Sequence, residues 1–173
     1  MHQSEAGALY LSDTASGQIA VYQPDGAGEF VFQGGTGGAA YGLARHVIGL
    51  RTLEMGGVTH VFAADCVENG VISYRADPVG GHLVEQGSMS AAKGLGIMQP
   101  VDMEVVQAYG QGYVLLASAG TSGGAISVMQ VAPDGRLGPT DHVLDTLETR
   151  FGQVQSLEVI SAGGRVYVLA GGG

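Results

Sequence analysis

The stretch Gly17-Gln18-Ile19-Ala20-Val21-Tyr22 decides the fold, because similar stretches return twice along the chain. They are Gly70-Val71-Ile72-Ser73-Tyr74-Arg75 and Gly124-Ala125-Ile126-Ser127-Val128-Met129, and their isoleucines lie 53 and then 54 positions apart. Apolar runs upstream of these stretches end at a spacing of 53 residues, at Leu11, Ala64, Ala117 and Ala170. A fixed period of this size indicates a repeat architecture.

Each period is predicted to hold four antiparallel strands. Glycine turns follow the first strands and supply the positive φ of a tight hairpin. The second strands are apolar on both faces, as are strands that lie between two sheets. The repeated isoleucines mark the third strands, and Pro-Asp-Gly-type turns lead into weaker fourth strands. First strands are expected at 50–55, 103–108 and 157–162; second strands at 8–11, 60–64, 113–117 and 166–170; fourth strands at 29–33, 82–86 and 136–140.

Four antiparallel strands in every ~53 residues describe the blades of a β-propeller, an all-β fold. We therefore predict a partial propeller over residues 1–173, with about three and a quarter blades, that begins and ends on a second strand. Closed propellers have about 4–8 blades, so the remaining blades are expected from the same protein or from a second chain. A β-sandwich is the alternative, which the matching turns and spacings disfavour. The repeat units are expected at 8–44, 45–97, 98–150 and 151–173.

The composition excludes several classes of partner. The net charge is −9, with seven Lys and Arg residues against sixteen Asp and Glu, so we expect no nucleic acid and no anionic membrane surface as partners. We also expect no membrane span, because no apolar run approaches about 18 residues. Cys66 is the single cysteine, which excludes an intrachain disulfide. The acidic, lysine-poor composition favours an extracellular over a cytoplasmic location.

Candidate site residues lie where first strands begin and second strands end, because antiparallel pairing brings these ends to one face. First strands line the propeller axis, so these residues are expected to form a polar ring at the mouth of the channel, where a small molecule or a protein could bind. The candidate ligand-binding residues are Arg45, His46, Asp13, Asp65, Gln99 and Gln153.

Each candidate also has a structural interpretation. Asp13 and Asp65 can cap turns through backbone amides, and Gln99 and Gln153 can satisfy the backbone between blades. His46 beside Arg45 is the strongest functional candidate, since a histidine at a channel mouth can act as acid, base or ligand.

Other motifs give no clear chemistry. No two histidines have a metal-ligand spacing, so neither a metal site nor a cofactor is predicted. The glycine loop at residues 34–38 lacks the Lys-Ser/Thr pair of a phosphate-binding loop. His60 falls inside a predicted strand, where we expect a structural histidine with its hydrogen bonds satisfied.

The segment from Ala125 to Leu137 resembles the blade pattern of the seven-bladed lactonase-like propellers, the superfamily of the 6-phosphogluconolactonase type. Gln99-Pro100 resembles the start of that family's G-x-P-x-H segment, although Asp102 stands where the histidine is expected. The resemblance implies a seven-bladed fold and a lactonase activity. Related propellers also include binding modules and scaffolds, so the fold alone does not assign the activity.

A fainter resemblance is to the propeller regions of large bacterial proteins with hemolysin-type calcium-binding repeats. It rests on the glycine-rich, acidic style and on the Leu169-Ala170-Gly171-Gly172-Gly173 ending. The calcium-binding nonapeptide G-G-x-G-x-D is absent from this chain, so calcium is expected only in a wider protein.

Two functions follow as hypotheses. The first is a non-catalytic propeller module, a binding or scaffold platform in a larger, exported bacterial protein. The second is a lactonase-like hydrolase acting on a sugar lactone, in which Arg45 orients the substrate and His46, or Asp65 through a water, acts as the base. The absence of a catalytic motif favours the first hypothesis.

Overall fold

The computed structural model describes residues 2–3, 7–13, 16–36, 46–77, 82–120 and 123–172. Within these ranges the chain forms strands β1 to β14, one 3-10 helix (η1, Ala91–Lys93) and no α-helix. The strands are β1 (His2–Gln3), β2 (Leu9–Ser12), β3 (Ile19–Pro24), β4 (Phe30–Gly35), β5 (Val47–Met55), β6 (Val58–Asp65), β7 (Gly70–Ala76), β8 (Leu83–Ser90), β9 (Pro100–Ala108), β10 (Gln111–Gly120), β11 (Gly123–Val131), β12 (Leu137–Leu144), β13 (Val154–Ala162) and β14 (Arg165–Gly172).

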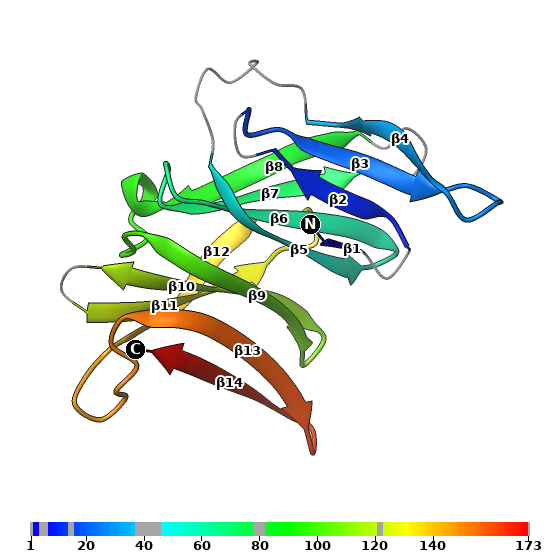
Figure 1. Cartoon of the computed structure of the whole chain (residues 1–173). Coiled ribbons are helices and arrows are strands. Elements are labelled where there is room, and N and C mark those ends of the chain that lie inside the picture. Colours follow the sequence, from blue (N-terminus) through cyan, green and yellow to red (C-terminus); the bar gives the residue numbers. More distant parts are fainter. Residues whose placement is uncertain are drawn as a thin grey trace.

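The strands form four antiparallel sheets that follow one another along the chain (Figure 1). Sheet 1 holds β1–β4, sheet 2 holds β5–β8, sheet 3 holds β9–β12, and sheet 4 is the hairpin β13–β14. Strands that are consecutive in sequence are hydrogen-bonded neighbours in every sheet. The predicted all-β class, with four antiparallel strands in a repeat, is therefore confirmed.

The beginning of the chain differs from the prediction. β1 pairs with β2 through His2 opposite Tyr10 and Gln3 opposite Leu9. The chain therefore does not open on a second strand, and sheet 1 already has four strands. The fourth strands are also longer than predicted, because β8 and β12 continue to Ser90 and Leu144.

A β-bulge recurs at one place in sheets 2, 3 and 4. The pairing of the first and second strand skips Ile48 in sheet 2, Val101 in sheet 3 and Gln155 in sheet 4. A bulge bends a strand and increases its local twist. Its recurrence at equivalent places shows that the repeat is a repeat of backbone geometry as well as of sequence.

The positions of the bulges show that the predicted alignment of the second strands is wrong in sheet 4. The residue directly after the bulge pairs with Ala64 in sheet 2 and with Ala117 in sheet 3. In sheet 4 the same position, Ser156, pairs with Gly171 and not with Ala170. The spacing of 53 residues therefore holds between sheets 2 and 3, whereas sheet 4 follows at 54.

The repeated isoleucines of the third strands are likewise not all equivalent. Ile126 pairs with Ala117, and the matching partner of Ala64 is Val71. Ile72 lies one residue further on, so its side chain points to the opposite face of the sheet. It packs between sheets 1 and 2, whereas Ile126 packs between sheets 3 and 4.

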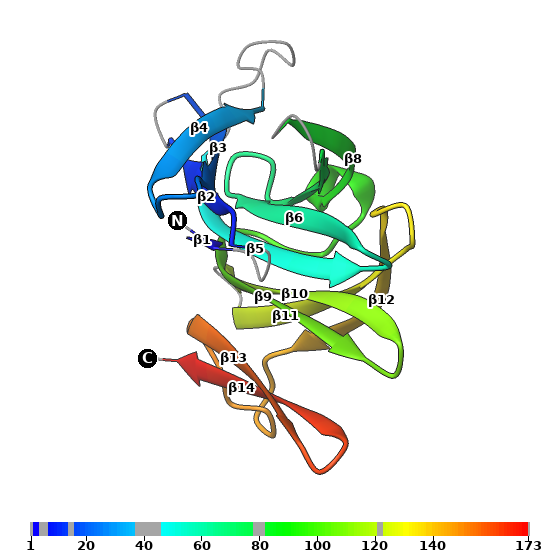
Figure 2. The same cartoon turned by 90° about the vertical axis from the view of Figure 1, so that its right-hand side faces the viewer.

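The sheets pack face to face, and apolar side chains fill the three spaces between them. Along one border of the molecule the first strands lie next to one another, with β5 beside β9 and β9 beside β13 (Figure 2). The cluster between sheets 1 and 2 includes Tyr10, Ile19, Leu50 and Val61; that between sheets 2 and 3 includes Phe62, Met103, Leu116 and Met129; that between sheets 3 and 4 includes Leu115, Phe151, Val154 and Leu157.

Candidate functional site

The residues that the sequence predicts to form a polar ring belong to the sheet edges where first strands begin and second strands end. The backbone N–H of Cys66 donates to the carbonyl of His46 at 3.1 Å, and Ala119 N donates to the carbonyl of Gln99 at 3.1 Å. These bonds place the start of β5 beside the end of β6 and the start of β9 beside the end of β10. Arg45 lies outside the described residues.

Asp65 serves as a turn cap. Its side chain is fully buried, and Oδ1 accepts the backbone N–H groups of Val67 at 2.7 Å and Glu68 at 3.2 Å. Oδ2 is buried and has no hydrogen-bond partner among the described residues. A carboxylate held in this way binds the turn after β6, and it has no exposed oxygen with which to activate a water.

The other ring candidates lie at the surface. His46 is exposed, and its described hydrogen bond uses the backbone carbonyl. Asp13 is exposed and accepts the hydroxyl of Ser16 at 2.6 Å. Gln99 and Gln153 are exposed and share a positive φ, 55° and 53°, at the same point before a first strand. These two glutamines therefore mark a backbone turn that recurs in two repeats.

Asn69 joins this edge although the sequence analysis did not select it. Its Oδ1 accepts the backbone N–H of Gln99 at 2.8 Å. The turn before β7 in sheet 2 is thereby linked to the residue that precedes β9 in sheet 3. Strand pairing and the Asn69 side chain thus bring His46, Asp65 and Gln99 to one edge. No hydrogen bond described for Gln153 connects it to this group, and the contacts at Asp13 described above are local.

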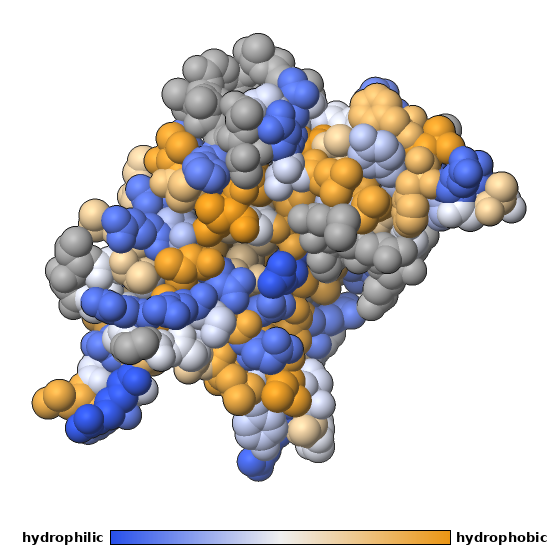
Figure 3. All heavy atoms as spheres, in the orientation of Figure 1, coloured by the Kyte–Doolittle hydropathy of each residue, from blue (hydrophilic) through white to orange (hydrophobic). Residues whose placement is uncertain are grey.

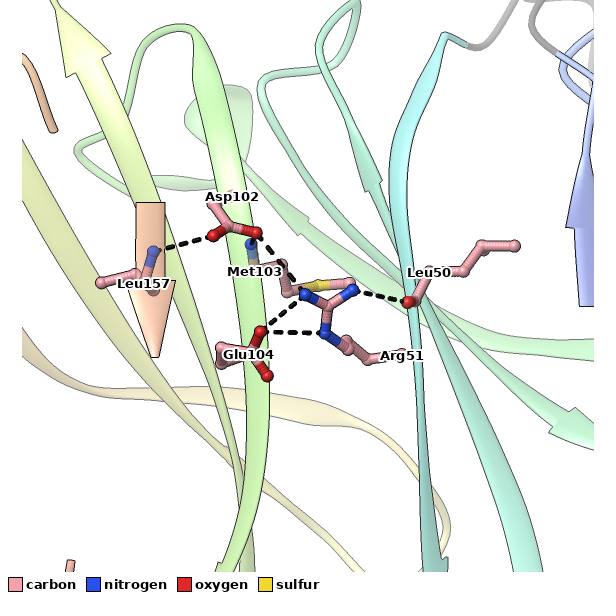
Figure 4. A network of polar contacts seen from close by, with 6 residues as sticks. All are labelled: Leu50, Arg51, Asp102, Met103, Glu104 and Leu157. Atoms are coloured by element: carbon pink, nitrogen blue, oxygen red, sulfur yellow. Dashed lines mark hydrogen bonds and ion pairs between the residues drawn. The ribbon is translucent and has the colours of Figure 1, made fainter. Parts of the chain in front are cut away.

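The first strands β5, β9 and β13 carry a polar network that the sequence analysis also missed (Figure 4). Arg51 on β5 donates through Nη2 and Nε to Glu104 Oε1 on β9, at 2.6 and 3.2 Å. Asp102 Oδ1 lies 3.6 Å from Arg51 Nη2, and its Oδ2 accepts the backbone N–H of Leu157 on β13 at 2.7 Å. The hydrogen bonds from Arg51 to Glu104 raise the pKa of the guanidinium, which stays charged.

This network connects sheets 2, 3 and 4 in one chain of contacts. Arg51 and Glu104 are 53 residues apart and occupy the same position of successive repeats. Their side chains are 27 % and 19 % exposed, so the pair is partly shielded from solvent. The arrangement positions neighbouring sheets.

A cleft lies at the opposite edge, between sheets 1 and 2. Its volume is about 660 Å³, within the usual range for small-molecule sites. It is formed by the ends of first and third strands and the starts of second and fourth strands. The lining residues are Ala8, Tyr10, Val21, Gln23, Pro24, Glu54, Gly57, Val58, Thr59, Arg75, Ala76, Asp77 and Val84.

The polar groups of this cleft include charges of both signs. Glu54 is partly buried and accepts the hydroxyl of Thr59 at Oε1. Arg75 is exposed, and no ion pair of its guanidinium occurs within the described ranges. Tyr10 forms part of the apolar floor, and burial together with the Glu54 charge raises the pKa of its phenol.

Two further findings concern the chemistry open to the chain. Among the described residues, no three His, Cys, Asp or Glu side chains gather in a group that could hold a metal ion. A search of the same residues finds no helix with the length and apolar character needed to cross a bilayer.

No family model matches the chain, and no curated protein matches its sequence.

Proposed function

We propose that this chain is part of a β-propeller whose blades are sheets 1 to 4. The recurring bulge, the neighbouring first strands and the network from Arg51 to Leu157 support this proposal. In a propeller the blades pack face to face around an axis, and their first strands lie next to one another along that axis. Sheets 2 to 4 have this arrangement of first strands. The resemblance to lactonase-like propellers and to propeller regions of hemolysin-type calcium-binding proteins agrees with the same fold.

Within that fold we assign a non-catalytic binding function. The observation that carries it is the cleft between sheets 1 and 2, where an apolar floor meets Glu54, Arg75 and Asp77. Two carboxylates and one guanidinium suit a small organic molecule that carries a positive group and a carboxylate, such as a basic amino acid. An ion pair formed in a partly buried cleft is screened less than one at the surface.

The binding test uses L-arginine as the probe, with isothermal titration against wild type, Glu54→Gln and Glu148→Gln. Glu148 lies in an exposed turn away from the cleft, so its substitution makes the same change of charge outside the site. We expect wild type and Glu148→Gln to bind with equal affinity, and Glu54→Gln to bind at least about tenfold more weakly. Absence of binding to wild type, or equal binding by all three proteins, overturns this assignment.

The lactone hydrolase is the second hypothesis, and the observation at Asp65 speaks against it. A general base must reach the attacking water directly, and the Asp65 carboxylate is buried with Oδ1 bound by turn amides. His46 remains as the exposed candidate. Proton release from glucono-δ-lactone at constant pH tests the activity, and a rate above background that falls in His46→Ala would establish the hydrolase instead.

A further inference from the structure

The outward face of sheet 4 carries exposed apolar side chains. The pairing of β13 with β14 places Ile160 opposite Tyr167 and Glu158 opposite Leu169, so these four side chains share one face. Ile160, Tyr167 and Leu169 are 46 %, 49 % and 49 % exposed. The other face of the hairpin packs on sheet 3 through Leu157.

The same face is covered one repeat earlier. In sheet 3, Tyr113 pairs with Val106 and Leu115 pairs with Glu104, as Tyr167 and Leu169 pair with Ile160 and Glu158 in sheet 4. Leu115 is only 4 % exposed, because sheet 4 packs against it. The open face of sheet 4 is therefore one half of an interface that the molecule already forms between its sheets.

Sheet 1 presents the other half of this interface at the far end of the molecule. Leu9 pairs with Tyr22, and Tyr22 pairs with Phe32, so the three side chains share the face of sheet 1 that points away from sheet 2. Phe32 is 61 % exposed and packs edge-on against Tyr22, with 5.6 Å between the centroids of the two rings. Figure 3 shows apolar surface over β3 and β4.

The equivalent face of sheet 3 is buried. Val114 and Met129 pair with each other on the face of sheet 3 that points away from sheet 4, as Leu9 and Tyr22 do on the face of sheet 1 that points away from sheet 2, and both are fully covered by sheet 2. The chain therefore carries the two complementary halves of its own sheet-to-sheet interface, one at each end. Exposed apolar faces of this kind mark sites of protein association.

We propose that a second copy of this chain docks head to tail, with the open face of sheet 4 on the outer face of sheet 1 of its partner. The contact continues the face-to-face packing of sheets 1 to 4. It is heterologous, so it closes into a ring if the rotation between copies allows and otherwise extends as a filament. The inference rests on the repeat of the interface and is independent of the ligand assigned to the cleft.

The test is a measurement of mass by light scattering over about 5 to 200 µM protein, since association depends on protomer concentration. Wild type is expected to reach at least twice the monomer mass of 17.6 kDa. Leu169→Asp removes the sheet 4 half of the contact and Phe32→Asp removes the sheet 1 half. Each variant alone is expected to weaken association at least about tenfold, because a charge is buried without a partner.

Mixing the two variants distinguishes head-to-tail docking from other modes. A heterologous dimer of Leu169→Asp with Phe32→Asp retains one intact interface, formed by the wild-type sheet 4 face of one and the wild-type sheet 1 face of the other. We therefore expect the mixture to recover a species of twice the monomer mass. Symmetric pairing of two β14 edges would not respond to Phe32→Asp and would not be rescued by mixing.

The control is Tyr109→Asp, since Tyr109 is 81 % exposed in a turn and lies on neither face. It is expected to associate as wild type does, and circular dichroism establishes that all variants are folded. A monomeric wild type at 200 µM, a Phe32→Asp variant with unchanged mass, or a mixture that stays monomeric overturns the proposal. The ligand titration described above is unaffected by any of these results.

Discussion

His60 is a buried histidine whose ring makes no hydrogen bond to the described residues. It is 1 % exposed, and neither Nδ1 nor Nε2 has a partner, so the expectation of a satisfied structural histidine is wrong in this respect. Its ring packs against Gly135 of sheet 3, where an added Cβ would lie 2.7 Å from Nδ1. Burial lowers the pKa of His60; the charges of Glu54 and Asp134 oppose this shift, and that of Arg75 adds to it.

This environment predicts that the protein loses stability as the pH falls below neutrality. An unfolded histidine takes up a proton near pH 6.5, whereas folded His60 has a lower pKa and stays neutral. Between these two pKa values the unfolded state binds more protons, so the free energy of unfolding decreases as the pH falls. Urea unfolding at pH 7.5, 6.5 and 5.5 measures the effect.

The His60→Phe variant keeps an apolar ring and removes the titrating group. Its stability is expected to change less than that of wild type between pH 7.5 and 5.5. His82→Gln is the matched control, because His82 is exposed and its substitution should leave the wild-type slope unchanged. Equal slopes for wild type and His60→Phe would contradict the assignment of the pH dependence to His60.

At the scale of the strands, Asp102 has a structural role that its sequence motif does not reveal. It stands where the resembling family has a histidine, yet its Oδ2 accepts the N–H of Leu157 and so joins β9 to β13. Its Oδ1 accepts the adjacent N–H of Met103 at 2.8 Å. The residue thus holds sheet 4 against sheet 3 at the point where both first strands leave their bulges.

Replacing Asp102 by Ala is expected to lower the free energy of unfolding by about 1–3 kcal/mol, because the Leu157 N–H loses a charged acceptor. Asp141→Ala is the control, since Asp141 makes the same local bond to the next N–H, at 2.8 Å, on the exposed strand β12. Arg51→Met should cost less than about 1 kcal/mol, because its ion pair is partly solvated. Urea denaturation measures the stability of all three variants. An Asp102→Ala variant as stable as Asp141→Ala would contradict the structural role assigned to Asp102.

The sequence predicted the class and order of these elements better than their register. The turns and the first strands repeat clearly because glycines and apolar runs mark them. The second and third strands are buried on both faces, so they lack the alternation that fixes which side chain points where. The spacing of the isoleucines therefore aligns Ile72 with Ile126, although the two side chains point to opposite faces of their sheets.

The candidate site was predictable only in part, for a related reason. Antiparallel pairing places His46 beside Cys66 and Gln99 beside Ala119, which the order of the strands predicts. The cleft at the other edge needs residues from the ends of several strands, among them Tyr10, Glu54 and Arg75, and no local spacing connects them. The sequence also gave no sign that Asp65 would be fully buried.

For the whole molecule, burial is concentrated in its middle. In sheets 2 and 3 the second and third strands, β6, β7, β10 and β11, are mostly buried. The outer strands β4 and β12 and the terminal strand β14 are mostly exposed. β14 departs from the prediction for second strands, because no sheet of the described structure covers its outward face.

This distribution predicts that the sheets open in a fixed order. Opening of β4, β12 or β14 exposes little apolar surface, whereas opening of β6 or β10 separates sheets that share a buried cluster. Amide hydrogens of β6, β7, β10 and β11 are therefore expected to exchange roughly tenfold or more slowly than those of β4 and β12. Hydrogen–deuterium exchange followed by mass spectrometry measures these rates. If head-to-tail docking occurs, raising the protein concentration should slow exchange in β14 and leave β12 unchanged, because β14 lies in the proposed contact and β12 does not. Uniform exchange across all sheets would mean that the molecule opens as a single unit, and the graded order argued from burial would be wrong.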